Sequence, residues 1–103
     1  MSQYDNVSVT KKANIYFDGR CISHTVILND GSRKSLGVLL PSTLTFKTGS
    51  PEVMELLSGH CRVRLAGSEA WIDYRGGQSF EVPGQSSFDI EILEITDYVC
   101  HFG

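Results

Sequence analysis

Apolar and polar residues alternate along much of this chain. Phe88, Ile90 and Ile92 share one side of a segment whose other side carries two carboxylates, and residues 61–65 repeat the pattern with two arginines on the polar side. A period of two is typical of a β-strand with one buried face, because successive side chains point to opposite sides of a strand. These segments are therefore predicted to be strands.

Glycine-bearing turns divide the chain into many short segments. The residues gathered there favour the backbone angles and local hydrogen bonds of tight turns. Short alternating segments between such turns indicate an all-β sandwich or barrel, and 103 residues are enough for a single domain with one core. The turn segments are 29–32, 48–51, 66–68, 75–77 and 83–84.

Two groups of residues resemble the metal motif of the cupin superfamily. Glu52 and Gly59 have the spacing of the glutamate and glycine that close its first half, and Gly77 and Pro83 have the spacing of the glycine and proline that open its second half. The resemblance implies a cupin-like β-barrel of the jelly-roll type.

The histidines of the cupin motif are absent. Their three positions fall on Thr45, Lys47 and Phe88, none of which is a usual metal ligand. A lone carboxylate such as Glu52 binds a divalent ion weakly, so we expect no metal and no other cofactor. A zinc site built from the neighbouring histidines and cysteines is disfavoured, because adjacent residues on a strand point to opposite faces.

One segment carries a conflicting signal. Residues 51–58 contain Glu, Met and Leu, which favour a helix, and Gly59 is suited to end one. A helix isolated among strands would be very short, and the cupin resemblance implies a strand here. We therefore interpret this segment as a strand that leads into Ser58 and Gly59.

Charge and cysteine content limit the partners and the location. Nine Lys and Arg against 12 Asp and Glu give a formal net charge of -3, so we expect no binding to nucleic acid through phosphate attraction. Three cysteines without close spacing favour reduced thiols and a cytoplasmic location. We expect no secretory signal in the polar first 13 residues and no contact with a membrane, because every apolar run is far too short to cross one.

Beyond the cupin pattern, a second resemblance rests on residues 14–19, 44–48, 51–54, 58–59, 77–84, 86–88 and 97–100. In these stretches the chain resembles the small cupin-type pyrimidine/purine nucleoside phosphorylases. The resemblance implies an enzyme that cleaves purine and pyrimidine nucleosides with inorganic phosphate, giving ribose 1-phosphate and free base. The match begins near residue 14, so we interpret residues 1–13 as a polar arm or added edge strand and residues 14–103 as the cupin-like barrel domain.

Such a reaction needs a site that holds an anion beneath a positively charged sugar, because its transition state resembles an oxocarbenium ion. Lys47 is the leading candidate to seat phosphate, since its aligned position points into the barrel, with a further hydrogen bond from the hydroxyl of Thr45. Glu52 is the candidate catalytic residue, which accepts hydrogen bonds from the ribose and stabilises the developing charge. The alternatives are a surface lysine at 47 and a structural ion pair between Glu52 and Lys47.

Phe88 and Gln85 are the candidate contacts to the base. The ring of Phe88 is suited to stack on a base of either class, and the Gln85 amide can donate or accept a hydrogen bond. Core packing and a solvated turn are the respective alternatives. Phe46 alternates with Thr45 and Lys47 and is therefore left out of the predicted site. The arginines of the polar strand face are assigned to the surface, and no general acid is identified.

Two other functions fit the same residues. A cupin that binds a small anion or sugar without turnover would use the same Lys47, Thr45 and Glu52. A metal cupin with oxygenase or isomerase chemistry would need ligands that the chain lacks. For the phosphorylase we expect nucleoside and inorganic phosphate as partners, and a homodimer joined through edge strands.

Overall fold

The computed structural model describes residues 2–102; Met1, the start of the expected arm, and Gly103, the end of the expected barrel domain, lie outside the described residues. Strands follow one another along this part of the chain, and none of its helices is long and apolar enough to cross a membrane. The elements are β1 (Ser8–Val9), β2 (Asn14–Tyr16), the 3-10 helix η1 (Phe17–Gly19), β3 (Cys21–Ile27), β4 (Arg33–Leu39), β5 (Ser42–Lys47), β6 (Glu52–Leu65), β7 (Ile72–Arg75), β8 (Ser79–Val82) and β9 (Ser87–Phe102).

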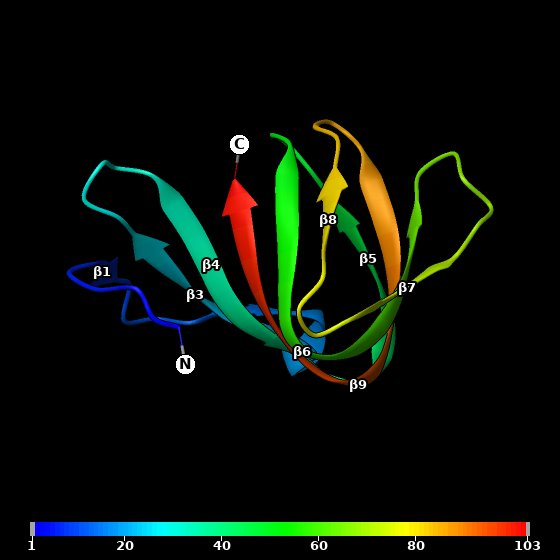
Figure 1. The fold of residues 1–103 in the computed structure, drawn as a ribbon, viewed down its shortest axis with the longest axis horizontal. Helices are drawn as coiled ribbons and strands as arrows, with labels where there is room; N and C mark the ends of the chain where they lie inside the picture. The colour runs from blue at the N-terminus through cyan, green and yellow to red at the C-terminus, as the bar shows by residue number, and fades with distance from the viewer. Residues whose placement is uncertain (1, 103) are drawn as a thin grey trace.

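Two long antiparallel strands, β6 and β9, connect the whole fold. They bend together, so that the sheet folds back on itself in a U shape (Figure 1). The first half of β6 and the second half of β9 form a first sheet with β3, β4 and β8. The other halves form a second sheet with β5 and β7. The prediction of an all-β sandwich or barrel is confirmed.

The bend in β6 is centred on Gly59. Its φ of 102° lies in the region that favours glycine, and the pairing of β6 with β9 shifts register on both sides of it. A Cβ atom at this position would lie 2.7 Å from the Cα of Thr96 on β9. The absence of a side chain therefore lets the two long strands stay in contact while they pass from one sheet to the other.

The interpretation of residues 51–58 as a strand is confirmed, because β6 begins at Glu52 and pairs with β8 and β9. Tertiary pairing outweighs the local helix propensity here. The predicted apolar faces of β6 and β9 are also confirmed, since they are buried between the two sheets. The core consists of Cys21, Leu39, Leu44, Met54, Leu56, Cys61, Val63, Phe80, Val82, Phe88, Ile90, Ile92, Tyr98 and Cys100.

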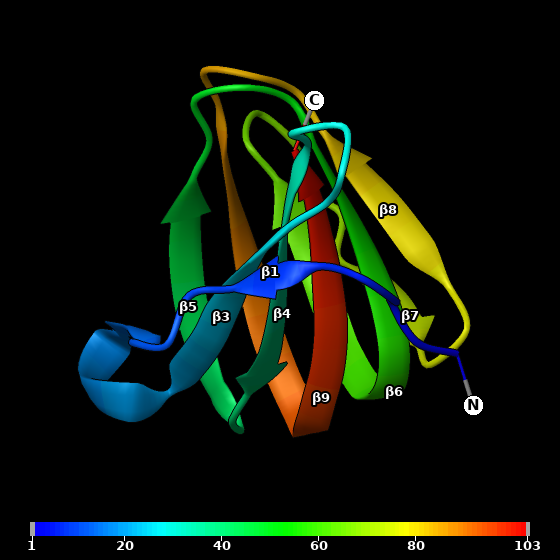
Figure 2. The same ribbon diagram turned by 90° about the vertical axis from the view of Figure 1, so that its left-hand side faces the viewer.

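The N-terminal segment crosses the outer face of the first sheet (Figure 2). It adds β1 at the edge, where Ser8 pairs with Ile27 of β3, and β2 pairs with the same strand further along. Val26 and Val99 point to this outer face and are nevertheless buried, which is consistent with cover by the segment. The inner face of the first sheet is left to form one side of a cavity.

Candidate functional site

A cavity of about 330 Å³ opens between the two sheets, and its size suits a small organic molecule. Five strands contribute side chains to its lining, and the end of β2 and the start of η1 add Tyr16 and Phe17. One part of the lining is aromatic, and another carries hydroxyls, thiols and a carboxylate. The lining residues are Tyr16, Phe17, Cys21, Ser23, Ser35, Thr45, Phe46, Lys47, Glu52, Met54, Phe88, Tyr98, Cys100 and Phe102.

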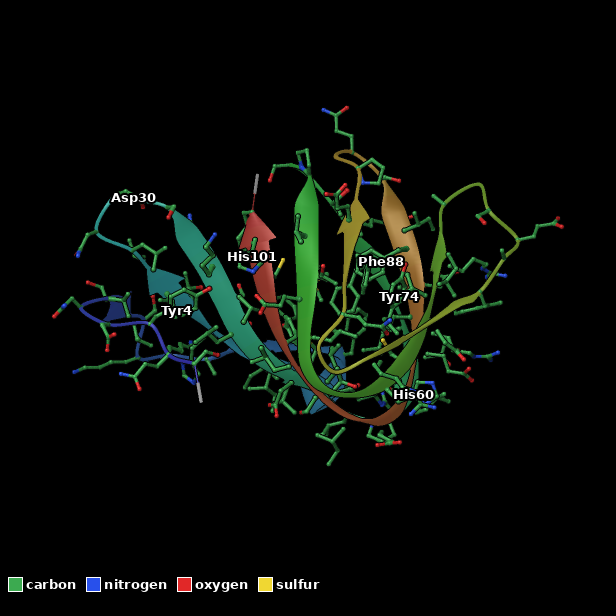
Figure 3. The ribbon with its side chains drawn as sticks, viewed as in Figure 1. Tyr4, Asp30, His60, Tyr74, Phe88 and His101 are labelled. Atoms are coloured by element: carbon green, nitrogen blue, oxygen red, sulfur yellow. The ribbon has the colours of Figure 1, made fainter. Side chains whose placement is uncertain are left out.

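The aromatic part of the lining is built from Phe17, Phe46 and Phe88. The rings of Phe46 and Phe88 are stacked, with centroids 5.4 Å apart and planes at 18°. The rings of Phe17 and Phe46 are T-shaped, with centroids 5.2 Å apart. Phe88 lies inside the curve of the long strands (Figure 3) and is only 2% exposed. Most of its surface is therefore used in core packing, whereas Phe17 and Phe46 offer more accessible rings.

Glu52 lies at the start of β6 with its carboxylate directed at the cavity. The Cys100 thiol of β9 donates to its Oε1 at 3.5 Å. Partial burial raises the pKa of Glu52, and this hydrogen bond offsets part of the rise. The pKa of Cys100 is raised by burial and by the neighbouring Glu52 charge, so the thiol stays protonated and serves as the donor. Among the ion pairs of residues 2–102, none joins Glu52 to Lys47.

Tyr98 supplies a hydroxyl to the same cavity. Its side chain starts on β9 and reaches past β4 to β3, where the phenol oxygen lies 3.4 Å from the Cys21 sulfur. Burial raises the pKa of Tyr98, and the contact with Cys21 raises it further, while a hydrogen bond with Ser23 lowers it. The group is therefore a neutral hydroxyl, able to donate one hydrogen bond and accept others.

The structure corrects the predicted directions on β5. Leu44 and Phe46 point inward, while Thr45 and Lys47 point outward. The Thr45 hydroxyl donates to Oδ1 of Asp89 at 2.7 Å on the outer face, so it is not directed into the barrel.

The error has a physical cause. Thr45 and Glu52 lie on opposite sides of the turn at 48–51, and a change of one residue in that turn reverses the direction of every side chain of β5 relative to Glu52. Thr45 and Lys47 do reach the rim of the cavity, and Lys47 carries the one positive charge among the described lining residues.

Gln85, the other predicted contact to the base, lies apart from the cavity. It lies in the turn between β8 and β9 with a φ of 49°, and its backbone N–H donates to the Gly49 carbonyl at 3.0 Å. It is exposed and does not belong to the described residues that line the cavity. The alternative of a solvated turn residue is therefore the one that the structure favours.

The assignment of the strand arginines to the surface is confirmed. Arg62 donates through Nε to Glu91 at 2.7 Å, and Arg64 donates to Asp89 at 2.8 Å. Both guanidinium groups lie over the ring of Trp71, at 5.4 and 4.8 Å from its centroid. The hydrogen bond from Thr45, followed by the Arg64 contact, lowers the pKa of Asp89. These charges hold the outer face of the second sheet and are not directed at the cavity.

Sequence reasoning missed most of the polar lining. Ser23 and Ser35 come together only through the register of β3 and β4, which no local pattern reveals. Phe46 could have been found from the sequence, because it lies two residues after the apolar Leu44 and therefore on the same face of the strand. No group of three or more His, Cys, Asp or Glu within residues 2–102 is arranged to hold a metal ion.

Comparison with known proteins gives relatives over the whole chain. A family model described as pyrimidine/purine nucleoside phosphorylase matches residues 11–102. A curated protein of that name from Cupriavidus pinatubonensis is 69% identical over 103 residues, which cover 100% of this chain and 98% of the relative. One from Cupriavidus metallidurans is 67% identical and covers both chains completely.

Solved structures give the fold independently. A protein of unknown function from Acinetobacter sp. ADP1 superposes with a TM-score of 0.96 at 55% identity, covering 98% of each chain. A cupin superfamily protein from Desulfitobacterium hafniense superposes with a TM-score of 0.65 at 13% identity, covering 88% of this chain and 82% of that one. The predicted cupin-like fold of the jelly-roll type is confirmed.

Proposed function

Because this chain belongs to the pyrimidine/purine nucleoside phosphorylase family, we propose that it cleaves purine and pyrimidine nucleosides with inorganic phosphate. The observation that carries the proposal is the composition of the cavity. It combines aromatic rings for a base with a half-buried carboxylate and several hydroxyls for a sugar and an anion. The products are free base and ribose 1-phosphate.

Glu52 is the proposed catalytic residue. In the reaction the bond between the ribose C1′ and the base nitrogen breaks, and a phosphate oxygen forms the new bond to C1′. The base leaves with the bonding electrons, and the proton of hydrogen phosphate balances the proton that the base gains. A carboxylate in a partly desolvated site stabilises the positive charge on the sugar and accepts hydrogen bonds from its hydroxyls.

Phosphate is proposed to bind against hydroxyl donors, with Lys47 at the rim. Ser23, Ser35 and Tyr98 line the same cavity, and neutral hydroxyls donate hydrogen bonds to an anion. Lys47 is exposed on the outward side of an edge strand, so its long side chain must fold over the rim to reach the anion. The charge of Lys47 then contributes mainly to the capture of phosphate from solution.

The base is proposed to lie at the aromatic part of the lining. Stacking on a ring depends little on which base is present, because every base has a flat face. Few fixed polar contacts to the base would explain acceptance of both classes, since rigid polar recognition rejects ligands that leave buried groups unpaired. Phe88 is buried behind Phe46 and supports this aromatic part of the lining chiefly by stacking on the Phe46 ring.

The test is the release of free base from uridine, adenosine and inosine, with and without phosphate. Release that depends on phosphate and yields ribose 1-phosphate is the expected outcome. Correctly folded protein that binds nucleosides without forming product would instead support the alternative of a non-enzymatic binding protein. Ligand-dependent thermal stabilisation measures that binding separately.

The proposed enzyme works without a metal, so dialysis against a chelator leaves the rate unchanged.

The oligomeric state and the location of the enzyme are also part of the proposal. It is a homodimer, since within residues 2–102 β5 pairs with β9 alone and leaves an edge for a second subunit; sedimentation equilibrium should give twice the 11.4 kDa of one chain. It acts in the cytoplasm, which suits three free and buried cysteines.

A further inference from the structure

The hairpin loop between β2 and β3 has an unusual backbone. Tyr16 pairs with Cys21, so four residues close the loop. Within it, Phe17 has a φ of 54°, Asp18 of 56° and Gly19 of 91°. Left-handed backbone angles in hairpin loops are normally taken by Gly, Asn or Asp, because a bulky side chain meets the backbone there. A phenylalanine at the first of these positions therefore carries a steric cost that another residue would avoid.

Core burial does not account for this phenylalanine. No residue of η1 is buried, and the Phe17 side chain is 38% exposed. Its carbonyl accepts the Arg20 backbone N–H at 3.2 Å, a contact that any residue at position 17 would make. Strained backbone positions often persist where the side chain serves a ligand site.

The ring of Phe17 has one specific position. It lines the cavity and meets the half-buried ring of Phe46 edge to face, with the two planes at 80°. Phe46 is backed by the stacked ring of Phe88. The hairpin loop thus adds an accessible ring to an aromatic wall that already belongs to the barrel.

We propose that Phe17 is a substrate-binding residue whose ring stacks on the purine or pyrimidine base of the bound nucleoside. The left-handed loop holds this ring against Phe46 at the mouth of the cavity. The inference rests on the proposed function for the identity of the ligand and extends it to a residue on a loop outside the cupin motif. A purine has the larger flat face, so the contact favours purine over pyrimidine nucleosides.

The test is Phe17→Ala, studied by calorimetric titration of adenosine and of uridine without phosphate and by steady-state kinetics with phosphate. Loss of one stacking contact is expected to weaken adenosine binding at least about fivefold, and uridine binding by a smaller factor. Phe17→Trp should retain the affinity because it keeps a flat ring. Ile15→Ala is the matched control, since Ile15 is 65% exposed on the adjacent strand and does not belong to the described lining residues.

The outcomes separate the two proposals. A Phe17→Ala dissociation constant within twofold of the wild-type value, and equal to that of Ile15→Ala, would overturn the stacking role. Full affinity in Phe17→Leu, which keeps apolar bulk without a flat ring, would overturn it as well. Wild-type protein that binds adenosine but releases no base would end the phosphorylase proposal while the titrations still decide the role of Phe17. Wild-type protein that binds neither nucleoside would overturn both.

Discussion

The ring of Tyr98 on β9 lies directly against Gly37 on β4. A methyl group at residue 37 would come within 2.7 Å of Cε1, Cζ and the hydroxyl oxygen of this tyrosine. The missing side chain is what allows the phenol to lie across β4 and reach Cys21 on β3. A glycine in the middle of a strand thus determines the position of a hydroxyl inside the proposed site.

Gly37→Ala should therefore displace Tyr98. Since the ring is buried and has little room to move, we expect a loss of about 1–3 kcal/mol in the free energy of unfolding, measured with urea. Phosphorolysis should slow as well, because the hydroxyl moves with the ring. Gly49→Ala is the control, since a methyl group at residue 49 has nothing within 4 Å. Equal effects of the two substitutions would contradict the argument.

Tyr98→Phe separates the hydroxyl from the ring. The ring keeps its packing against Gly37, whereas the cavity loses one hydrogen-bond donor. One such bond contributes about 0.5–1.5 kcal/mol, so the KM for phosphate should rise about two- to tenfold if the hydroxyl binds the anion. The KM for the nucleoside should change less. An unchanged KM for phosphate would remove Tyr98 from the anion site.

Glu52→Gln tests the catalytic carboxylate. The amide has nearly the same shape but no charge, so substrate binding should persist while the stabilisation of the oxocarbenium-like transition state is lost. We expect kcat to fall about a hundredfold or more, with a much smaller change in KM. The measurement is the rate of base release at saturating phosphate. A kcat close to that of the wild type would place the chemistry elsewhere.

The ionisation of Glu52 should also appear in the dependence of stability on pH. Burial raises its pKa above the ordinary value of 4.5, so between 4.5 and the raised pKa the folded protein holds a proton that the unfolded chain has released. Stability therefore falls as the pH rises through this window and stays lower above it. Glu52→Gln removes this dependence, so its stability relative to the wild type should increase from pH 4 to pH 7 in urea unfolding.

The same shift predicts the acidic limit of the activity. If the ionised carboxylate is required, kcat/KM should fall as the pH is lowered through a pKa above 4.5. A pH–rate profile measured on wild-type protein gives this value directly. A profile that is flat down to pH 4.5 would mean that the charge of Glu52 is not needed.

Thr45→Val tests the corrected direction of β5. The hydroxyl of Thr45 is bonded to Asp89 on the outer face, so both KM values should stay within twofold of the wild type. Stability should decrease slightly above the ordinary Asp89 pKa of 3.8, and the difference should disappear as the pH falls through the lowered pKa and Asp89 is protonated in both proteins. Thr43→Val, on the same face two residues earlier, is the control. A raised KM for phosphate would restore Thr45 to the site.

Much of the fold could be predicted because it is encoded locally. Alternation along β6 and β9 revealed their buried faces, and the spacing of Glu52 and Gly59 revealed a cupin strand despite its helix propensity. The glutamate was placed correctly at the cavity because it lies on the strand that anchored the alignment. The side-chain directions on β5 and the position of Gln85 were harder to predict because both depend on turns. The direction of β5 depends on the turn at 48–51, and Gln85 belongs to a turn itself.

The rest of the site could not be predicted because it depends on contacts between distant segments. Ser23 and Tyr98 approach each other only when β3, β4 and β9 pair in register and Gly37 leaves room. The orientation of Phe17 depends on a left-handed hairpin loop for which its own residue type gives no signal. Local patterns identify faces of strands, and tertiary pairing decides which faces meet.

The passage of β6 and β9 through both sheets has a consequence for how the molecule opens. Neither sheet can separate from the other as an independent unit, because each shares the same two continuous strands. Amide protons in the regularly paired stretches of β6 and β9, on either side of the bend at Gly59, should therefore exchange with solvent only through global unfolding, with one common free energy of opening. The short strands β1 and β7 at the edges can open on their own, so local unfolding is confined to these edge strands.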